Sequence, residues 1–464
     1  MTSTLIVGAG SAGCVLAARL SADPARSVRV IEAGPVFPAL EELPVELLDP
    51  GHLPVGPESR LVWRYPGNLV RGKLIGGSGA INGSYFIRPP ADDFAAWSVV
   101  AGPRWSFESV LPVFCALEDD ADFGAVPGHG IGGPIPISRT SDPTEFSVEF
   151  AQQCVAAGFT EIPDLNAPSA DTGAGFGRVP LAISRGRRAG PAITHLFPAL
   201  HRSNLILTGE TMVTRLLLRG TRVIGVEWAR GRERGTTYAD EVVLCAGAVE
   251  SAALLIRSGI GPEPLLRSLG VPVLRPAPVG AWCTDHPEIG IEFAGAQPAW
   301  STVALEYVLE MDDLELRPYT AMFTPGLRRV GVALMRPEST GELTLVSTDP
   351  AVAARVDHRY LRAEQDRARL REAVALTADL LGRRIGPVDD SWLRANLGTS
   401  QHLSGTCRMG PAGDERAVVD EQGRVHGIEA LTVADLSVVP VPLRRGPQAT
   451  TVMLAASIAD HMVV

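Results

Sequence analysis

Three glycines near the N-terminus have the spacing of a nucleotide-binding turn. Gly8, Gly10 and Gly13 form a GxGxxG pattern that directly follows an apolar run at residues 5–7. In such a pattern the first glycine permits a tight turn, the second lets the backbone approach a pyrophosphate, and the third lets a helix pack closely on a strand. Glu32, nineteen residues after Gly13, is placed to accept hydrogen bonds from a ribose diol. The pattern predicts dinucleotide binding, and the alternative is a glycine turn needed only for packing.

His402 is the second candidate for chemistry, because it stands in the segment HLSGTCRMG beside a glycine turn. A neutral imidazole, with an ordinary pKa of about 6.5, can take up a proton at physiological pH. A histidine in this setting is more often structural, so its residue type alone leaves both interpretations open.

Residues 67–88 contain glycines too closely spaced for a stable helix or strand. Such a stretch lets the backbone touch a flat or anionic group. It also contains Lys73, the only lysine of a chain that otherwise uses arginine. We interpret Lys73 as a site residue, and the alternative is a solvated charge at a strand edge.

The elements that must position these residues follow a strand–turn–helix pattern. Apolar runs at residues 28–31, 242–246 and 431–434 predict buried parallel strands beside the one at 5–7. A buried helix is expected over 449–458, opened by Pro447. Ligands of such sheets gather at the carboxyl ends of the strands. Asp435 and the start of the last helix are therefore expected to face a cofactor.

The other segments predict a second, interleaved unit. Residues 128–137 predict a turn feeding an edge strand, with His129 as a loop histidine and not a ligand. Residues 205–228 predict a hairpin or meander, 343–346 a strand, and 364–381 an amphipathic helix. The chain has no repeats and no low-complexity linker. The domains are therefore expected to interleave.

Composition restricts the class of protein. The 464 residues allow two or three domains. The net charge of -10 has the wrong sign for a nucleic-acid partner. Six scattered cysteines without CxxC predict reduced thiols and no metal site. We found neither a signal peptide nor a transmembrane segment in the sequence, which predicts a cytoplasmic protein with peripheral membrane contact left open.

Eight segments of the chain carry recognisable motifs. In chain order they are GAGSAG at 8–13, RGKLIGGSGAINGSYFIR at 71–88, HGIGGP at 129–134, LCAGAVESAALLIRSGIGP at 244–262, DHP at 285–287, STDP at 347–350, HLSGTCRMG at 402–410 and VADLSVVP at 433–440. Together they resemble the glucose-methanol-choline (GMC) family of FAD-dependent oxidoreductases.

The resemblance implies an α/β fold, with a Rossmann-like FAD-binding domain interleaved with a smaller α+β substrate domain that contains an antiparallel sheet. The FAD-binding domain is expected over residues 1–140, 195–285 and 400–464. The substrate-binding domain is expected over 141–194 and 286–399.

Site residues are carried over from the family position by position. His402 matches the catalytic histidine, which removes the hydroxyl proton of an alcohol while hydride moves to flavin N5. The residues expected to bind FAD are Gly8, Gly10, Ser11, Ala12, Gly13, Glu32, Ala33, Trp63, Lys73, Gly76, Gly77, Ser78, Asn82, Gly83, Val213, Ala246, Asp435 and Gln448.

The sequence also departs from the family pattern. Ile81 stands where some members bind FAD covalently through a histidine, so non-covalent FAD is implied. Glu250 and Ala252 replace a small residue and a proline, and the region from about 290 to 400 is short. Gly446 aligns with the second catalytic His or Asn, so that partner is missing.

The resemblance implies oxidation of a small-molecule alcohol, with electrons passed to an acceptor that need not be oxygen. The alternatives are a flavin-containing lyase and a redox-inert FAD-binding member. The compact length and arginine bias also resemble the actinobacterial member associated with the redox cofactor mycofactocin. That likeness implies a reduced redox cofactor as substrate.

Overall fold

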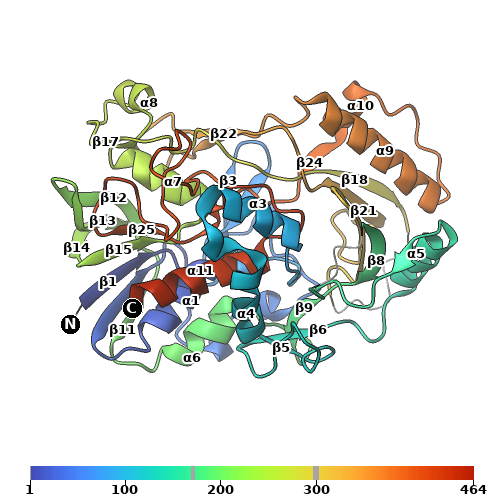
Figure 1. Cartoon of the computed structure of the whole chain (residues 1–464), viewed down its shortest axis with the longest axis horizontal. Helices are drawn as coiled ribbons and strands as arrows, with labels where there is room; N and C mark the ends of the chain where they lie inside the picture. The colour runs from blue at the N-terminus through green and yellow to red at the C-terminus, as the bar shows by residue number, and fades with distance from the viewer. Residues whose placement is uncertain (1, 169–172, 296–302, 464) are drawn as a thin grey trace.

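A computed structural model describes residues 2–168, 173–295 and 303–463. One part of the molecule is built on a parallel sheet, seen at the left of Figure 1. The described strands of this sheet, in spatial order, are β11 (Leu205–Thr208), β2 (Arg26–Ile31), β1 (Thr2–Val7), β15 (Glu241–Leu244) and β25 (Leu431–Val433). Segments from both ends of the chain thus pair within one sheet, and the four strands predicted for it are confirmed.

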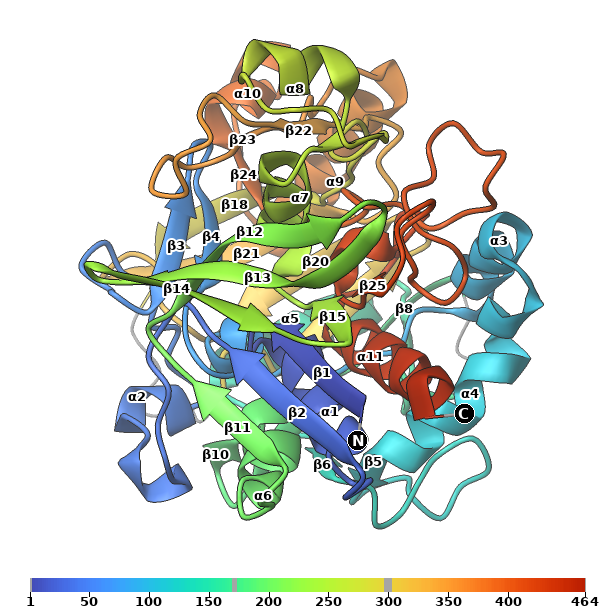
Figure 2. The same ribbon diagram turned by 90° about the vertical axis from the view of Figure 1, so that its left-hand side faces the viewer.

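Three helices contact the carboxyl ends or faces of this sheet. They are α1 (Ser11–Leu20), α7 (Gly247–Arg257) and α11 (Gln448–Val463). Figure 2 shows α1 and α11 side by side against the parallel strands, although they lie at opposite ends of the chain. The buried helix predicted over 449–458 is confirmed as part of α11. This helix is buried along most of its length and extends beyond the predicted range on both sides.

A second sheet lies at the right of Figure 1, where α5, α9 and α10 pack around it. Its described strands, in spatial order, are β24 (Leu397–Thr399), β18 (Pro287–Ala294), β21 (Leu327–Leu334), β20 (Leu314–Tyr319), β19 (Tyr307–Met311), β8 (Ala174–Arg178) and β7 (Thr160–Glu161). All neighbours in this sheet pair antiparallel except β7 and β8. The predicted fold class is confirmed, whereas the residue boundaries between the domains stay a prediction.

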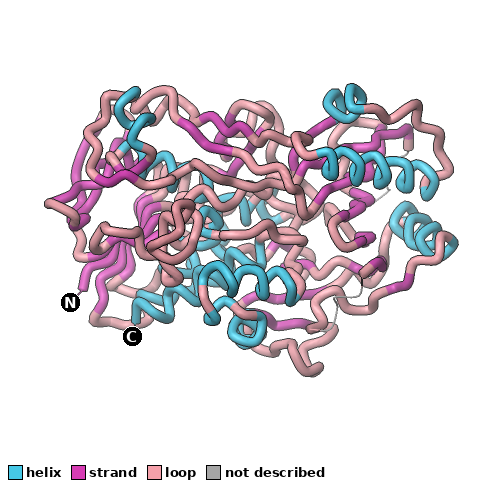
Figure 3. Tube along the Cα trace, turned by 45° about the horizontal axis from the view of Figure 1, so that its top comes forward, coloured by secondary structure: helices cyan, strands magenta, loops and turns pink. Residues whose placement is uncertain are grey.

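The helices around the second sheet are α5 (Glu145–Ala156), α9 (Glu364–Leu380) and α10 (Asp390–Asn396). The helix predicted over 364–381 is therefore confirmed. The strand predicted at 343–346 is β22 (Glu342–Thr344), which pairs with β23 (Arg355–Asp357). Long loops connect the two parts of the molecule, as the pink tube of Figure 3 shows.

Two strand predictions need correction. The strand after residue 134, β6 (Ile135–Ser138), is not at an edge, because β5 (Glu118–Asp120) and β9 (Leu181–Ser184) pair with its two sides. Of the hairpin or meander predicted over 205–228, the hairpin is confirmed for the second part of the segment only. β11 joins the parallel sheet, and only β12 (Met212–Arg219) and β13 (Arg222–Arg230) form a hairpin, which β14 (Glu233–Tyr238) extends.

The glycine-dense segment forms a short hairpin and a turn. The hairpin pairs β3 (Val62–Tyr65) with β4 (Leu69–Gly72), and a 3-10 turn, η2 (Gly77–Ala80), follows. Gly76 has φ of 87°, a left-handed conformation that favours glycine, directly before η2. The chain thereby places this turn beside the GxGxxG loop, where Gly10 and Gly76 form a bridge.

The remaining described elements are η1 (Leu40–Glu42), α2 (Val45–Leu48), α3 (Ala91–Ala101), η3 (Pro103–Trp105), α4 (Phe107–Leu117), β10 (Arg187–Arg188), η4 (Ala192–Leu196), α6 (Phe197–Ala199), β16 (Ile260–Gly261), α8 (Glu263–Ser268), β17 (Arg275–Pro276) and η5 (Leu436–Val438). Over the residues that the structure describes, none of the helices has the length and apolar character needed to cross a membrane.

Candidate active site

A continuous cavity of about 560 Å³ joins the two sheets. At one end it is lined by the loops that follow the parallel strands, including Gly8, Glu32, Ala246 and Asp435. At the other end the lining comes from strands of the antiparallel sheet. Crevices at the carboxyl ends of parallel strands are the usual ligand sites of such folds.

The GxGxxG loop leaves its backbone open toward the cavity at Gly10. A Cβ atom at Gly10 would meet nothing closer than 3.8 Å, whereas a Cβ at Gly13 would lie 2.0 Å from the carbonyl oxygen of Gly8. Gly10 also precedes α1, whose first turn carries no acidic side chain and whose N-cap side-chain bond is absent among the described residues. The N–H groups at such a helix end can bind an anion.

Glu32 holds the loop in place. Its two carboxylate oxygens accept hydrogen bonds from the backbone N–H groups of Ala9 and Gly34, each at 2.8 Å. Burial raises the pKa of this carboxyl, although these hydrogen bonds oppose the shift. Glu32 lines the cavity as well, and each oxygen keeps a second lone pair for a ligand hydroxyl. The sequence pattern did not reveal its bonds to Ala9 and Gly34.

Asp435 links two strand ends. Its carboxylate accepts hydrogen bonds from the N–H of Gly247 at 2.8 Å, the hydroxyl of Ser251 at 2.5 Å and the N–H of Ser437 at 2.9 Å. Burial raises the pKa of Asp435, and the same hydrogen bonds oppose this effect. Asp435 lines the cavity and also fixes the start of α7 against the end of β25.

Most of the residues predicted to bind a cofactor lie around this one cavity. Those that line it are Gly8, Gly10, Ser11, Ala12, Glu32, Ala33, Trp63, Gly77, Ser78, Asn82, Gly83, Val213, Ala246, Asp435 and Gln448. Three of the predicted residues lie behind this lining. Gly13 packs α1 against Gly8, and the N–H of Gly76 donates to the carbonyl of Ala9 at 2.7 Å. Lys73 places its Nζ 4.2 Å from the ring centroid of Trp63, a cation–π contact.

His402 lies at the other end of the cavity, just after β24. Gly446 lines the cavity too, and a Cβ there would meet only the ring of Tyr85, at 3.5 Å, among the described residues. Tyr319 and Phe323 add aromatic rings, 5.0 Å apart between centroids. The arrangement combines a titratable imidazole with an aromatic wall and an open position at Gly446.

The charged side chains of this wall are paired. Arg317 donates to Glu288 at 2.8 Å and to Glu315 at 2.6 Å, and Ser400 donates to Glu288 at 2.8 Å. A nitrogen of Arg329 lies 3.8 Å from the other oxygen of Glu288. Glu288 and Glu315 are therefore both paired with Arg317 and are not free carboxylates.

Burial lowers the pKa of His402 well below that of an ordinary histidine. The positive charges of Arg317 and Arg71 lower it further, and so does His286 when it is protonated. The imidazole is therefore neutral near pH 7, the form in which a histidine can accept a proton.

The residues present fit FAD. The bare Gly10 backbone and the uncapped start of α1 suit a pyrophosphate, and Glu32 suits a ribose. The side chain at Ile81 lines the cavity and offers no nucleophile. The start of α11, at Gln448, presents the positive end of a helix dipole to the same cavity.

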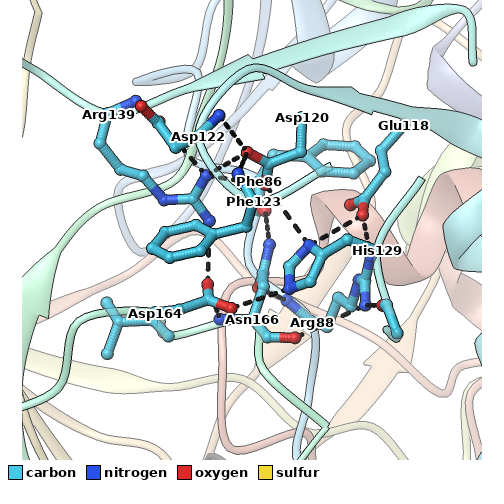
Figure 4. A network of polar contacts seen from close by, with 12 residues as sticks. Phe86, Arg88, Glu118, Asp120, Asp122, Phe123, His129, Arg139, Asp164 and Asn166 are labelled. Carbon is cyan, nitrogen blue, oxygen red and sulfur yellow. Dashed lines mark hydrogen bonds and ion pairs between the residues drawn. The ribbon is translucent and has the colours of Figure 1, made fainter. Parts of the chain in front are cut away.

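A second polar cluster surrounds His129 (Figure 4). Its imidazole contacts Glu118 at 3.0 Å and Asp164 at 2.8 Å, and Asp120 lies 3.5 Å away. Burial opposes the charge on His129, but hydrogen bonds to Asp120, Asp164 and Glu118 raise its pKa to about 11. His129 is therefore an imidazolium.

Two arginines complete this His129 cluster. Arg139 bonds to Asp120 at 2.6 Å and to Asp164 at 3.0 Å, and Arg88 pairs with Glu118. Although Glu118, Asp120 and His129 lie close enough to ligate a metal, Arg88 and Arg139 already pair with these carboxylates among the described residues. The geometry indicates a structural ion network. His129 lies in a loop as predicted, whereas the prediction that it is not a ligand stays a prediction.

Comparison with known proteins identifies the family. Two sequence profiles described as GMC oxidoreductase match residues 2–288 and 337–455. The chain belongs to the GMC oxidoreductase family. A GMC-type oxidoreductase of Rhodococcus erythropolis is 40% identical over 97% of this chain and 96% of its own length. GMC enzymes bind FAD, so the family membership agrees with the fit of the cavity.

Further GMC relatives carry named activities. The 5-(hydroxymethyl)furfural oxidase of Methylovorus sp. (strain MP688) is 33% identical over all of this chain and 99% of its own. Human mitochondrial choline dehydrogenase is 31% identical over 99% of this chain and 89% of its own. The crystal structure of pyridoxine 4-oxidase from Mesorbium loti superimposes with a TM-score of 0.91 at 28% identity and covers 99% of both chains. This GMC chain is thus an enzyme of the oxidoreductase class.

Several cavity residues carried no usable sequence signal. Arg317 and Tyr319 reach the cavity because strand β20 of the antiparallel sheet lies along one of its sides. Tyr85 reaches it from the segment after η2. His286 contacts His402, although 116 residues separate them. The DHP segment at 285–287 marks this position in the sequence, but neither its composition nor its spacing indicates the contact.

Proposed function

We propose that this GMC enzyme oxidises a neutral alcohol with non-covalently bound FAD, and that His402 is the base. Bound FAD would accept hydride from the alcohol carbon. The proposal rests on one observation above all: the neutral imidazole of His402 lies in the same cavity as the glycine loop that suits the pyrophosphate. Ile81, which offers no nucleophile to a flavin, supports non-covalent binding.

The substrate wall favours a flat hydroxymethyl compound. Tyr85, Tyr319 and Phe323 supply aromatic faces, and Glu288 is paired with Arg317 and so is not a free carboxylate that would select a cation. Two relatives are named for 5-(hydroxymethyl)furfural and pyridoxine, which have this shape. Because the relatives include both oxidases and a dehydrogenase, the experiment compares oxygen with other electron acceptors.

The test is anaerobic stopped-flow reduction of the flavin. We expect 5-(hydroxymethyl)furfural, pyridoxine or benzyl alcohol to bleach the flavin faster than choline, with reduced mycofactocin as a further donor in the panel. Bleaching by no alcohol would overturn the proposal and favour the lyase or the redox-inert alternative. Acid precipitation should release the flavin into solution, and flavin retained in the pellet would contradict non-covalent binding.

The role of His402 is tested in the same assay. His402→Gln should slow flavin reduction by at least about 10²-fold, as expected for a lost general base, while FAD content stays unchanged. His426→Gln is the matched control, because His426 is a half-buried histidine bonded to the carbonyl of Gly410 and placed outside the cavity lining. Equal rates in the wild type and His402→Gln would defeat the assignment.

A further inference from the structure

Two histidines from distant parts of the chain meet at the substrate end of the cavity. Nδ1 of His286 lies 2.8 Å from Nδ1 of His402, and the two rings are nearly perpendicular, at 83°. A hydrogen bond between two such nitrogens needs one proton, carried by either ring. Which ring carries it decides which nitrogen of His402 can accept a proton from an alcohol.

Both rings are neutral near pH 7. Burial lowers the pKa of His286 to about 4 even though Asp285 opposes the shift. Burial also lowers the pKa of His402, and His286 and Arg317 add to this effect. A neutral imidazole carries a single N–H, so each ring has one donor and one acceptor.

The role of His402 as the base determines the direction of the bond. Nδ1 of His402 faces Nδ1 of His286, so Nε2 is the nitrogen of His402 that remains for a substrate in the cavity. Nε2 can accept a proton only if it carries none, so Nδ1 must carry the single proton of the neutral His402 ring. The Nδ1 atom of His286 is then the acceptor.

Asp285 holds the two histidine backbones in place. Its Oδ1 atom accepts the N–H of His286 at 2.8 Å and the N–H of His402 at 2.7 Å. Its Oδ2 atom accepts the hydroxyl of Thr399 at 2.8 Å. One buried carboxylate thus fixes the start of β18 against the end of β24, and with them the distance between the rings.

We propose that His286 is a positioning residue that accepts a hydrogen bond from Nδ1–H of His402 and so keeps Nε2 of His402 unprotonated toward the cavity. This inference rests on the proposed function only in taking His402 as the base. The proposal gives His286, in the DHP segment, a role in supporting His402. Gly446 cannot support His402 in this way because it has no side chain.

NMR of FAD-loaded protein labelled with ¹⁵N-histidine tests the tautomer without any substrate. His402→Gln and His286→Gln assign the two signals, and His426→Gln is the control that should leave both unchanged. We expect His402 to carry its proton on Nδ1 and His286 to carry its proton on Nε2. A proton on Nε2 of His402, or a cationic His286 at pH 7, would overturn the proposal even if the enzyme oxidises alcohols.

Kinetics provide the second readout. His286→Leu removes the acceptor and should slow flavin reduction about 10- to 100-fold, the usual effect of losing a residue that orients a reactive group. His286→Gln keeps an acceptor oxygen and should recover most of that rate. Equal losses in both variants would refute the positioning role. Failure of the wild type to reduce its flavin with any alcohol would instead refute the proposed function, while the NMR result stands.

Discussion

Replacing Gly10 with alanine should separate cofactor binding from folding. Gly10 has φ of -71° and ψ of -171°, which alanine adopts without strain, and the added methyl group would meet no atom closer than 3.8 Å. We therefore expect the free energy of unfolding of the Gly10→Ala apoprotein to lie within about 0.5 kcal/mol of the wild-type value, or to be slightly higher. The methyl group would, however, occupy the approach of a pyrophosphate to the loop.

The loss of affinity can be estimated from overpacking. One methyl group inserted into a close contact costs about 1–3 kcal/mol. For the FAD complex of Gly10→Ala this corresponds to a dissociation constant raised about 5- to 150-fold. Quenching of flavin fluorescence in titrations of apoprotein measures this constant, and urea unfolding of the same sample measures stability.

Gly13→Ala is the matched comparison. Alanine normally stabilises a helix interior by about 1 kcal/mol relative to glycine. Here the methyl carbon would lie 2.0 Å from the carbonyl oxygen of Gly8, so α1 must move off β1, and we expect the apoprotein to lose about 1–3 kcal/mol. A Gly10→Ala protein that binds FAD like the wild type, or a Gly13→Ala protein more stable than the wild type, would refute this interpretation of the loop.

Three further predictions concern the other buried groups. Glu32→Ala should weaken FAD binding by about 1–3 kcal/mol and also destabilise the apoprotein, because Ala9 and Gly34 lose their acceptor; unchanged affinity would remove Glu32 from the site. The pKa of His129 is raised from 6.5 to about 11, so its stabilising effect is full below pH 6.5 and disappears as the pH rises toward 11. His129→Asn should therefore lower the free energy of unfolding more at pH 6 than at pH 10, and a difference independent of pH would contradict the imidazolium. Gly446→Ala places its methyl group at ordinary contact distance from Tyr85 and should preserve the oxidation of small alcohols. Gly446→His should exclude bulky alcohols by overpacking. Equal rates of the two variants with a bulky alcohol would show that the substrate does not approach Gly446.

The sequence determined the nucleotide-binding half of the molecule. Gly8, Gly10 and Gly13 act within one turn, so their spacing alone specifies which backbone atoms approach each other. The strands on either side are short buried apolar runs, which are readable without knowledge of their partners. Two helices could also be placed to within a few residues, α11 from its apolar run and α9 from its amphipathic pattern.

Only the tertiary structure decided which side chains meet. The edge position expected for β6 was wrong because β5 pairs with it, and Lys73 lies against Trp63 behind the cavity lining. The contact between His286 and His402 spans 116 residues and depends on the pairing of β18 with β24. Local patterns encode backbone shape over a few residues, whereas the packing of distant segments selects hydrogen-bond partners. The hydrogen bond between the two histidines is therefore a property of the folded chain, held by Asp285, whose carboxylate bonds to the backbone of both residues.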